Sequence, residues 1–201
     1  YDFHAIDQNR MGIFIADVAG HGISAALLGA MMKISFSAHK DLAEKPHELL
    51  RALDNDLATY TENLFITAQY MVLNFENNTY LFANAGHWPA CLIKHKENSL
   101  IPLYTRGRPL GTGNRTEFVL AKNEIAPGDR IFLFTDGIIE CRNKSGELFG
   151  EERLHQLFFE TKELPAEKAL ESVLYRASQW TGRLREDRFD DDVCIVCIDI
   201  V

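Results

Sequence analysis

The chain has 201 residues, of which 46% are hydrophobic, and a formal net charge of -8. This length and apolar content suffice for a sizeable hydrophobic core. The acidic balance, without a long block of Lys or Arg, argues against nucleic-acid binding. No apolar run reaches the roughly 18 residues that a membrane helix needs. Four cysteines are too few for a disulfide scaffold, so we expect a cytoplasmic protein.

Hydrophobic periodicity predicts strands in runs, with helices in pairs between them. This order favours an α+β fold with antiparallel sheets and packed helices over an alternating parallel sheet. In chain order we expect a strand at 12–16, helices at 23–40 and 46–60, strands at 67–75, 80–84 and 90–94, a loop at 100–115, strands at 117–121 and 130–135, helices at 151–159 and from 165 onward, and a last strand at 193–201.

The segment from Ile15 to Gly22 is the most informative part of the sequence. An apolar strand ends at Asp17, and the chain then turns on Gly20 and Gly22 into a helix that begins at Ile23. A carboxylate at a strand end suits a metal ion, whereas a glycine turn before a helix N-terminus suits an anion. The segment therefore predicts a place where a cation and a phosphate could meet.

Two further acidic segments share this design. Asp136 ends a strand and precedes Gly137, and three successive aspartates, 190–192, precede the last strand. Hard cations such as Mg²⁺ and Mn²⁺ prefer oxygen ligands, and two such ions can activate one water for attack at phosphorus. Each aspartate taken alone is more simply interpreted as an ordinary turn residue. Together they favour a shared metal site.

Five motifs, in order, resemble those of the SpoIIE/RsbU-type branch of the PP2C-like metal-dependent serine/threonine phosphatases. The order and spacing match this branch over essentially the whole chain. At the last motif, Cys194 replaces the usual Thr or Ser, which we interpret as a packing change. The matching segments are 17–27, 84–90 (Asn-Ala-Gly-His-Trp-Pro-Ala), 107 with 109–111, 134–140 with 146–150, and 191–194.

The resemblance implies a PP2C-like sandwich of two antiparallel β-sheets flanked by helix pairs. It implies two Mn²⁺ or Mg²⁺ ions, with Asp17 bridging both, the Val18 carbonyl assisting one, and Asp136 and Asp191 holding the second. A water between the metals would be the nucleophile, so these three aspartates would be catalytic through that water. No further organic cofactor is implied.

The resemblance also implies partners. The substrate would be phosphoserine or phosphothreonine on a STAS-type anti-anti-sigma regulator. Residues 1–201 are expected to form a single phosphatase domain, truncated at its N-terminus, because the chain starts at Tyr1 and a strand pattern begins almost at once. A sensor or receiver domain is expected upstream, and a homodimer could form through that upstream segment.

Several other residues have two interpretations. His21 could contact phosphate or protonate the leaving oxygen, or it could be an ordinary turn residue. We expect His87 to make a structural hydrogen bond rather than to act in catalysis. Arg106 and Arg108 could meet a phosphate or an acidic partner, but a solvated surface is the simpler interpretation. Glu140 could order the Asp136 loop or simply face water, and we expect the charged segment 183–188 to face solvent.

Cys194 and Cys197 have the spacing of a redox or zinc motif. Because residues i and i+3 of a strand point to opposite faces, we interpret both as packing residues.

Three functions remain open from the sequence. The first is an active metal-dependent protein phosphatase, which the presence of all three principal aspartates favours. The second is a catalytically weak or inactive relative that acts as a regulated binding module. The third is a metallohydrolase that acts on small phosphoesters.

Overall fold

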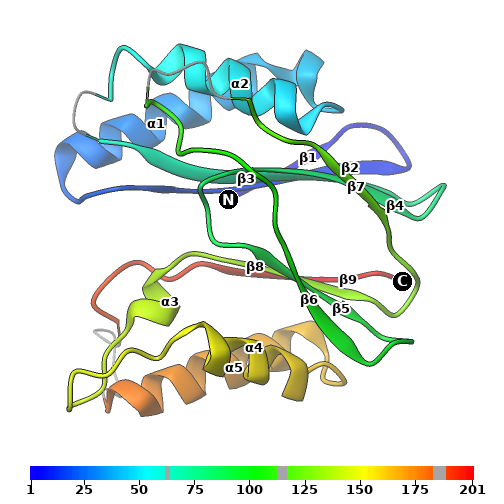
Figure 1. Cartoon of the computed structure of the whole chain (residues 1–201), viewed down its shortest axis with the longest axis vertical. Coiled ribbons are helices and arrows are strands. Elements are labelled where there is room, and N and C mark those ends of the chain that lie inside the picture. Colours follow the sequence, from blue (N-terminus) through cyan, green and yellow to red (C-terminus); the bar gives the residue numbers. More distant parts are fainter. Residues whose placement is uncertain (62–63, 113–116, 183–188) are drawn as a thin grey trace. The chain divides into compact units, whose positions relative to one another are not determined.

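A computed structural model describes residues 1–61, 64–112, 117–182 and 189–201 (Figure 1). The chain divides into two compact units. Unit 1 comprises Tyr1–His87 and Tyr104–Ile125, and unit 2 comprises Trp88–Leu103 and Ala126–Val201. Each unit contains one antiparallel sheet and its own helices. No described helix has the length and apolarity to cross a membrane.

The sheet of unit 1 has five strands in the order β1-β2-β3-β4-β7. Asn78, with φ 53°, makes the tight turn between β3 and β4, where asparagine tolerates the left-handed conformation. The β2–β3 ladder pairs nine residues of each strand, from Arg10 opposite Asn74 to Val18 opposite Ile66. The strands are β1 (Asp2–Ala5), β2 (Arg10–Val18), β3 (Ile66–Asn74), β4 (Thr79–Ala85) and β7 (Ala121–Glu124).

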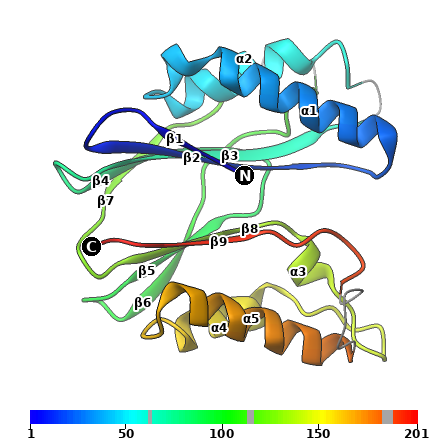
Figure 2. The same cartoon turned by 180° about the vertical axis from the view of Figure 1, so that it is seen from behind.

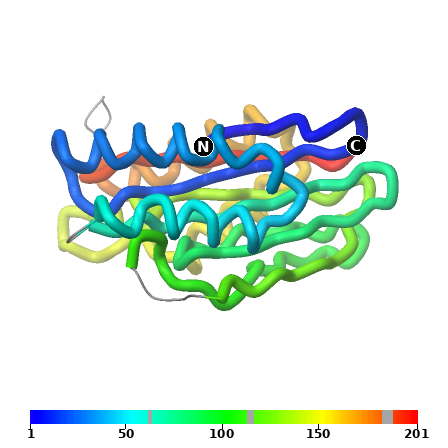
Figure 3. The backbone as a smooth tube through the Cα atoms, turned by 90° about the horizontal axis from the view of Figure 1, so that it is seen from above, coloured from blue at the N-terminus to red at the C-terminus, as the bar shows by residue number. Residues whose placement is uncertain are grey.

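Two helices, α1 (Ile23–Ala38) and α2 (Pro46–Leu57), run side by side over one face of this sheet (Figures 1 and 3). A short 3₁₀ turn, η1 (Lys40–Leu42), joins them. Pro46 stands in the first turn of α2, where its missing N–H leaves no helical hydrogen bond unmade. Phe14 stacks on Phe36 with ring centroids 4.6 Å apart, which ties β2 to α1 in the core of unit 1.

The sheet of unit 2 has four strands in the order β6-β5-β8-β9. Helices α4 and α5 cover one of its faces (Figure 2), where Phe132 and Phe158 stack with centroids 4.0 Å apart. A one-turn helix, α3, follows β8. The elements are β5 (Ala90–Lys94), β6 (Ser99–Leu103), β8 (Arg130–Phe134), α3 (Gly137–Glu140), α4 (Glu151–Glu160), α5 (Ala166–Thr181) and β9 (Ile195–Asp199).

The α+β class and the antiparallel sheets are confirmed. The segment 100–115, expected to be a loop, begins within strand β6. The strand expected at 117–121 lies instead at Ala121–Glu124, where it pairs with β4. Strand β1 and helix α3 were not among the expected elements.

Candidate metal centre

Asp17 lies near the end of β2, on the face of the unit 1 sheet opposite the helices. Its neighbours Ala16 and Val18 pack against the core beneath α1 and α2, so the alternation of a strand turns Asp17 the other way. Its side chain is half-buried. Beyond it, the N–H of Ala19 bonds to the Phe65 carbonyl at 2.9 Å, which fixes the chain as it leaves the strand.

The glycine turn after Asp17 presents His21 to solvent. Gly20 and Gly22 have φ values of 98° and 88°, a left-handed region that favours glycine. Gly22 is the N-cap residue of α1 and has no side chain to bond the free N–H groups of the first turn. The turn therefore leaves backbone donors at the N-terminus of α1, with an exposed imidazole beside them.

In unit 2 the fold brings the Asp136 turn against the Asp191–Asp192 segment, although they are 55 positions apart in the chain. The contact passes through Gly137: a Cβ at this position would lie 2.4 Å from the Asp192 carbonyl oxygen. Only a residue without a side chain allows this approach. Two of the three predicted metal-ligating aspartates thus lie on adjoining segments.

Thr135 fastens these two segments together. Its hydroxyl donates to the Asp192 carbonyl at 3.2 Å and accepts the Cys194 N–H at 2.9 Å. Its own N–H bonds to the Cys194 carbonyl at 3.0 Å. The backbone at Cys194 is therefore held by Thr135, and these bonds do not involve the Cys194 side chain.

Asp136 is half-buried and Asp191 is exposed, so neither of these two carboxylates is enclosed in the core of unit 2. Asp136 is the N-cap residue of α3, but its side chain makes no capping hydrogen bond; its carbonyl accepts the N–H groups of Ile139 and Glu140, each at 2.9 Å. Asp191 is exposed, and its carboxylate accepts the N–H of Asp192 at 2.8 Å. One carboxylate oxygen of Asp191 therefore accepts a hydrogen bond from the neighbouring backbone, and the side chain remains exposed to solvent.

The chemistry of these donors fits a hard divalent cation. Carboxylate oxygens and a backbone carbonyl, such as that of Val18, are ligands that Mg²⁺ and Mn²⁺ accept. Across the described ranges, no set of three or more His, Cys, Asp or Glu side chains is gathered as a ready metal site. Asp17 belongs to unit 1, and Asp136 and Asp191 belong to unit 2.

The Asn-Ala-Gly-His motif forms a closed turn at the end of β4. The Asn84 side chain accepts the His87 N–H and donates to the His87 carbonyl, each at 2.8 Å. The imidazole of His87 then pairs through Nδ1 with the Thr67 hydroxyl at 2.8 Å. The expected structural hydrogen bond of His87 is confirmed.

The Gly-x-Pro-Leu-Gly motif packs against the Asn84 turn and against α2. A Cβ on Gly107 would lie 1.8 Å from the Asn84 carbonyl oxygen. At the other end, Gly111 donates its N–H to the Asp54 carboxylate at 2.7 Å, and its carbonyl accepts the Thr61 hydroxyl at 2.6 Å. This motif therefore joins helix α2 to the Asn84 turn within unit 1.

Arg106, Arg108 and Glu140 are exposed, which agrees with the solvated-surface interpretation. The charged segment 183–188 lies outside the described residues. All four cysteines are free, and Cys197 packs against the core of unit 2. The spacing of Cys194 and Cys197 thus produces no disulfide.

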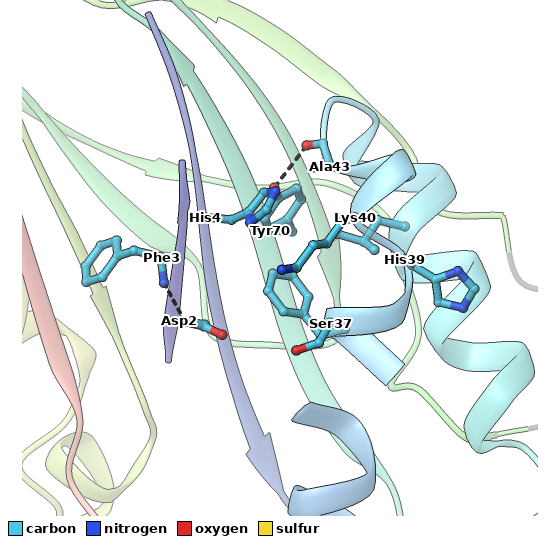
Figure 4. Close-up of a pocket in the computed structure, with 10 residues that line it drawn as sticks. Asp2, Phe3, His4, Ser37, His39, Lys40, Ala43 and Tyr70 are labelled. Atoms are coloured by element: carbon cyan, nitrogen blue, oxygen red, sulfur yellow. Dashed lines mark hydrogen bonds between the residues drawn. The ribbon is translucent and has the colours of Figure 1, made fainter. Parts of the chain in front are cut away.

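Unit 1 also contains a cavity of about 200 Å³ beside β1 and the end of α1 (Figure 4). Phe36, Leu49 and Tyr70 are among the apolar groups that line it, and the Tyr70 hydroxyl donates to the Ala43 carbonyl at 2.9 Å. Asp2 lines it as well, but its carboxylate pairs with Lys33 Nζ at 2.6 Å. None of the aspartates predicted to bind metal lines this cavity.

Sequence reasoning missed the two threonines. Thr67 and Thr135 each lie in or beside a strand that reads as ordinary β-sequence, and their partners are distant in the chain. Position offered a signal for Thr135, which directly precedes Asp136 within the motif segment 134–140.

Comparisons with known proteins agree with this fold. The sequence profile of the family described as Stage II sporulation protein E (SpoIIE) matches residues 7–201. Phosphoserine phosphatase RsbU of Bacillus subtilis is 32% identical over 143 residues, which are 71% of this chain and 43% of RsbU. The chain thus spans less than half the length of this curated relative.

Solved structures show the same architecture. The SiaA-PP2C domain of Pseudomonas aeruginosa superposes with a TM-score of 0.86 at 18% identity, covering 98% of this chain and 78% of that one. RsbX in complex with magnesium superposes with a TM-score of 0.66 at 14% identity, covering 97% and 83%. At these identities the likeness concerns the fold. With the profile match over nearly its whole length, the chain belongs to the SpoIIE family, the SpoIIE/RsbU-type branch of the PP2C-like phosphatases.

Proposed function

We propose that the chain is a metal-dependent phosphatase that hydrolyses phosphoserine or phosphothreonine in a protein. Asp17, Asp136, Asp191 and the Val18 carbonyl are its metal ligands. The observation that carries the proposal is the approach of the Asp136 turn to the Asp191–Asp192 segment through Gly137. Membership of the SpoIIE family and the name of the relative RsbU, a phosphoserine phosphatase, support the reaction.

Two ions of Mn²⁺ or Mg²⁺, when bound, would activate a water for attack at phosphorus. The magnesium bound by RsbX supports the choice of ion. The chain's own residues hold the ions and orient the phosphate. Thr135 and Gly137 keep the two acidic segments of unit 2 together. In this proposal His21, which is exposed beside the first turn of α1, would meet a phosphate or the leaving oxygen.

The substrate in this proposal is a small STAS-type anti-anti-sigma regulator in bacterial signalling, and the enzyme acts in the cytoplasm. Dephosphorylation would free the regulator to bind its partner. An upstream sensor or receiver domain of the same protein would control the activity, with a homodimer formed through the upstream segment. Resemblance to the SpoIIE/RsbU branch supports these assignments.

The first experiment is Mn²⁺ titration by calorimetry, alongside hydrolysis of an aryl phosphate and of a phosphorylated STAS protein. Asp17→Asn, Asp136→Asn and Asp191→Asn each replace one carboxylate oxygen by an amide nitrogen of similar size. We expect each variant to lose metal affinity and turnover together. Asp41→Asn, at an exposed carboxylate in η1, is the matched control and should behave like the unmodified chain.

The outcomes separate the functions left open by the sequence. Metal binding without turnover on either substrate would favour the regulated binding module. Turnover of the aryl phosphate alone would favour a hydrolase of small phosphoesters. If the unmodified chain binds no Mn²⁺ at millimolar concentration, the proposed metal ligation is wrong.

A further inference from the structure

A threonine faces the predicted metal ligand Asp17 from the neighbouring strand. Thr67 of β3 is the register partner of Asp17 in β2. Residues 66, 68, 70 and 72 of β3 pack beneath α1 and α2, so Thr67 points to the opposite face, as Asp17 does. Side chains directly opposite in an antiparallel pair have Cβ atoms about 5 Å apart, which brings the Thr67 hydroxyl within reach of the carboxylate.

A hydrogen bond fixes the orientation of the Thr67 hydroxyl. It pairs with His87 Nδ1 at 2.8 Å. His87 is in turn fixed at its backbone by both polar atoms of the Asn84 side chain, and it is 5% exposed. A short β-branched residue held by a buried imidazole has one defined orientation.

The turn that carries His87 is itself rigid. Gly86 has φ 72°, and a Cβ there would lie 2.7 Å from the Pro109 side chain. Gly107 packs closely against the Asn84 carbonyl oxygen. The Gly-x-Pro-Leu-Gly segment thus packs tightly against the Asn-Ala-Gly-His turn of the same unit, and we call these two segments the clamp. The clamp ends at the Thr67 hydroxyl, because His87 of the turn is hydrogen-bonded to it.

We infer that Thr67, oriented by His87, is a positioning residue that holds the carboxylate of Asp17 in the geometry needed to bind metal. This inference rests on the proposed function and assigns no contact with substrate to either residue. Partners that orient a metal-ligating side chain typically contribute about 10–100-fold to metal affinity. The Asn-Ala-Gly-His motif thereby acquires a role, because it fixes a side chain on β3 that faces Asp17 on β2.

The test is the Mn²⁺ dissociation constant of Thr67→Val, measured by calorimetry without substrate. Valine keeps the shape and removes the hydroxyl. We expect the dissociation constant to rise about 10–100-fold, and Thr67→Ser, which restores the hydroxyl, to recover most of the affinity. The Mn²⁺ concentration needed for half-maximal phosphatase activity should rise in parallel.

A second variant and a control complete the test. His87→Gln keeps Thr67 but removes its imidazole partner, and it should weaken Mn²⁺ binding in the same direction; it decides the question if Thr67→Val does not fold. Thr79→Val removes a hydroxyl at the far end of the same sheet, where it bonds Asn77. This control should bind Mn²⁺ like the unmodified chain.

A merely structural role gives a different result. If Thr67→Val and His87→Gln lower the melting temperature but leave the Mn²⁺ dissociation constant unchanged, the inference is overturned and the proposed function stands. If the unmodified chain binds no Mn²⁺, both are overturned. A loss of affinity that serine restores supports the inference.

Discussion

At the scale of single residues, Gly137 decides how closely the two acidic segments of unit 2 approach. Gly137→Ala would place a methyl group 2.4 Å from the Asp192 carbonyl oxygen and 3.3 Å from the Asp191 carbonyl carbon. These are backbone atoms, so the segments must separate. Overpacking of this kind costs about 1–3 kcal/mol. We expect a lower melting temperature together with weaker Mn²⁺ binding, measured by calorimetry.

Gly29 of α1 provides the control for this substitution. A Cβ there would make only ordinary contact, 3.8 Å from the Val18 side chain. Alanine also favours a helix by about 1 kcal/mol over glycine. Gly29→Ala should therefore keep or raise the melting temperature. Unchanged Mn²⁺ affinity in Gly137→Ala would show that separation of the segments does not matter for the ions.

The same scale shows where sequence reasoning ends. Strand ends and glycine turns marked Asp17, Asp136 and Asp191 as candidates, because both features can be recognised from the local sequence. The resemblance predicted that Asp136 and Asp191 share an ion, but the close contact of their segments through Gly137 did not follow from the sequence, since it depends on β8 pairing with β9, which is distant in the chain. The bond between His87 and Thr67 was missed for the same reason: only the histidine was singled out in advance.

At the scale of elements, helix α2 carries two aspartates whose pKa values move in opposite directions. Burial raises the pKa of Asp54 above its ordinary value, although its bond from Gly111 acts the other way. The Ser35 hydroxyl and then His39 lower the pKa of Asp56, against an opposing effect of burial. The two carboxylates therefore have opposite effects on stability as pH changes.

The sign for Asp54 follows from its raised pKa. The folded state binds the proton more tightly than the unfolded chain, so the contribution of Asp54 to stability falls as pH rises above about 4. Asp54→Asn removes the charge and keeps an oxygen to accept the Gly111 N–H. We expect its melting temperature at pH 7 to match or exceed that of the unmodified chain. Between pH 4 and 7, the melting temperature of the unmodified chain, followed by circular dichroism, should fall relative to that of Asp54→Asn.

Asp56→Asn is the control of opposite sign. Because the pKa of Asp56 is lowered, its contribution to stability is present above about pH 4 and is lost as pH falls through the folded value. This variant should melt lower than the unmodified chain at pH 7 and approach it in acid. Identical pH profiles for Asp54→Asn and Asp56→Asn would contradict the assignment.

Periodicity located the central elements well and the edges poorly. Strands β2 and β3 are long and apolar, and their positions agree with expectation within about two residues at each end. The segment 100–115 was predicted to be a loop because it contains three glycines and two prolines. It begins in β6, which is an edge strand, where the missing N–H of Pro102 leaves the sheet intact. Strand β7, also at an edge, is polar and takes its position from pairing with β4.

At the scale of the whole molecule, five motifs spread over the chain converge on a few local roles. Two contain the candidate aspartates of unit 2, one contains Asp17 and the turn into α1, and two form the clamp that ends at Thr67. Resemblance identified the family from the motifs alone. The structure adds what each motif holds in place, since hydrogen-bond partners and close backbone approaches follow from tertiary packing, which no single motif encodes.

A ligand that binds only the folded chain raises its melting temperature. At 100 times its dissociation constant, Mn²⁺ should contribute about 2.7 kcal/mol, which corresponds to about 5–10 °C for a chain of this length. If Asp17 and Asp136 are both ligands, Asp17→Asn in unit 1 and Asp136→Asn in unit 2 should each remove this shift, whereas Asp41→Asn should retain it. Differential scanning calorimetry with and without Mn²⁺ measures the shift. If one of the two substitutions leaves the shift intact, that aspartate contributes nothing to metal binding, and the ligand set must be redrawn around the other.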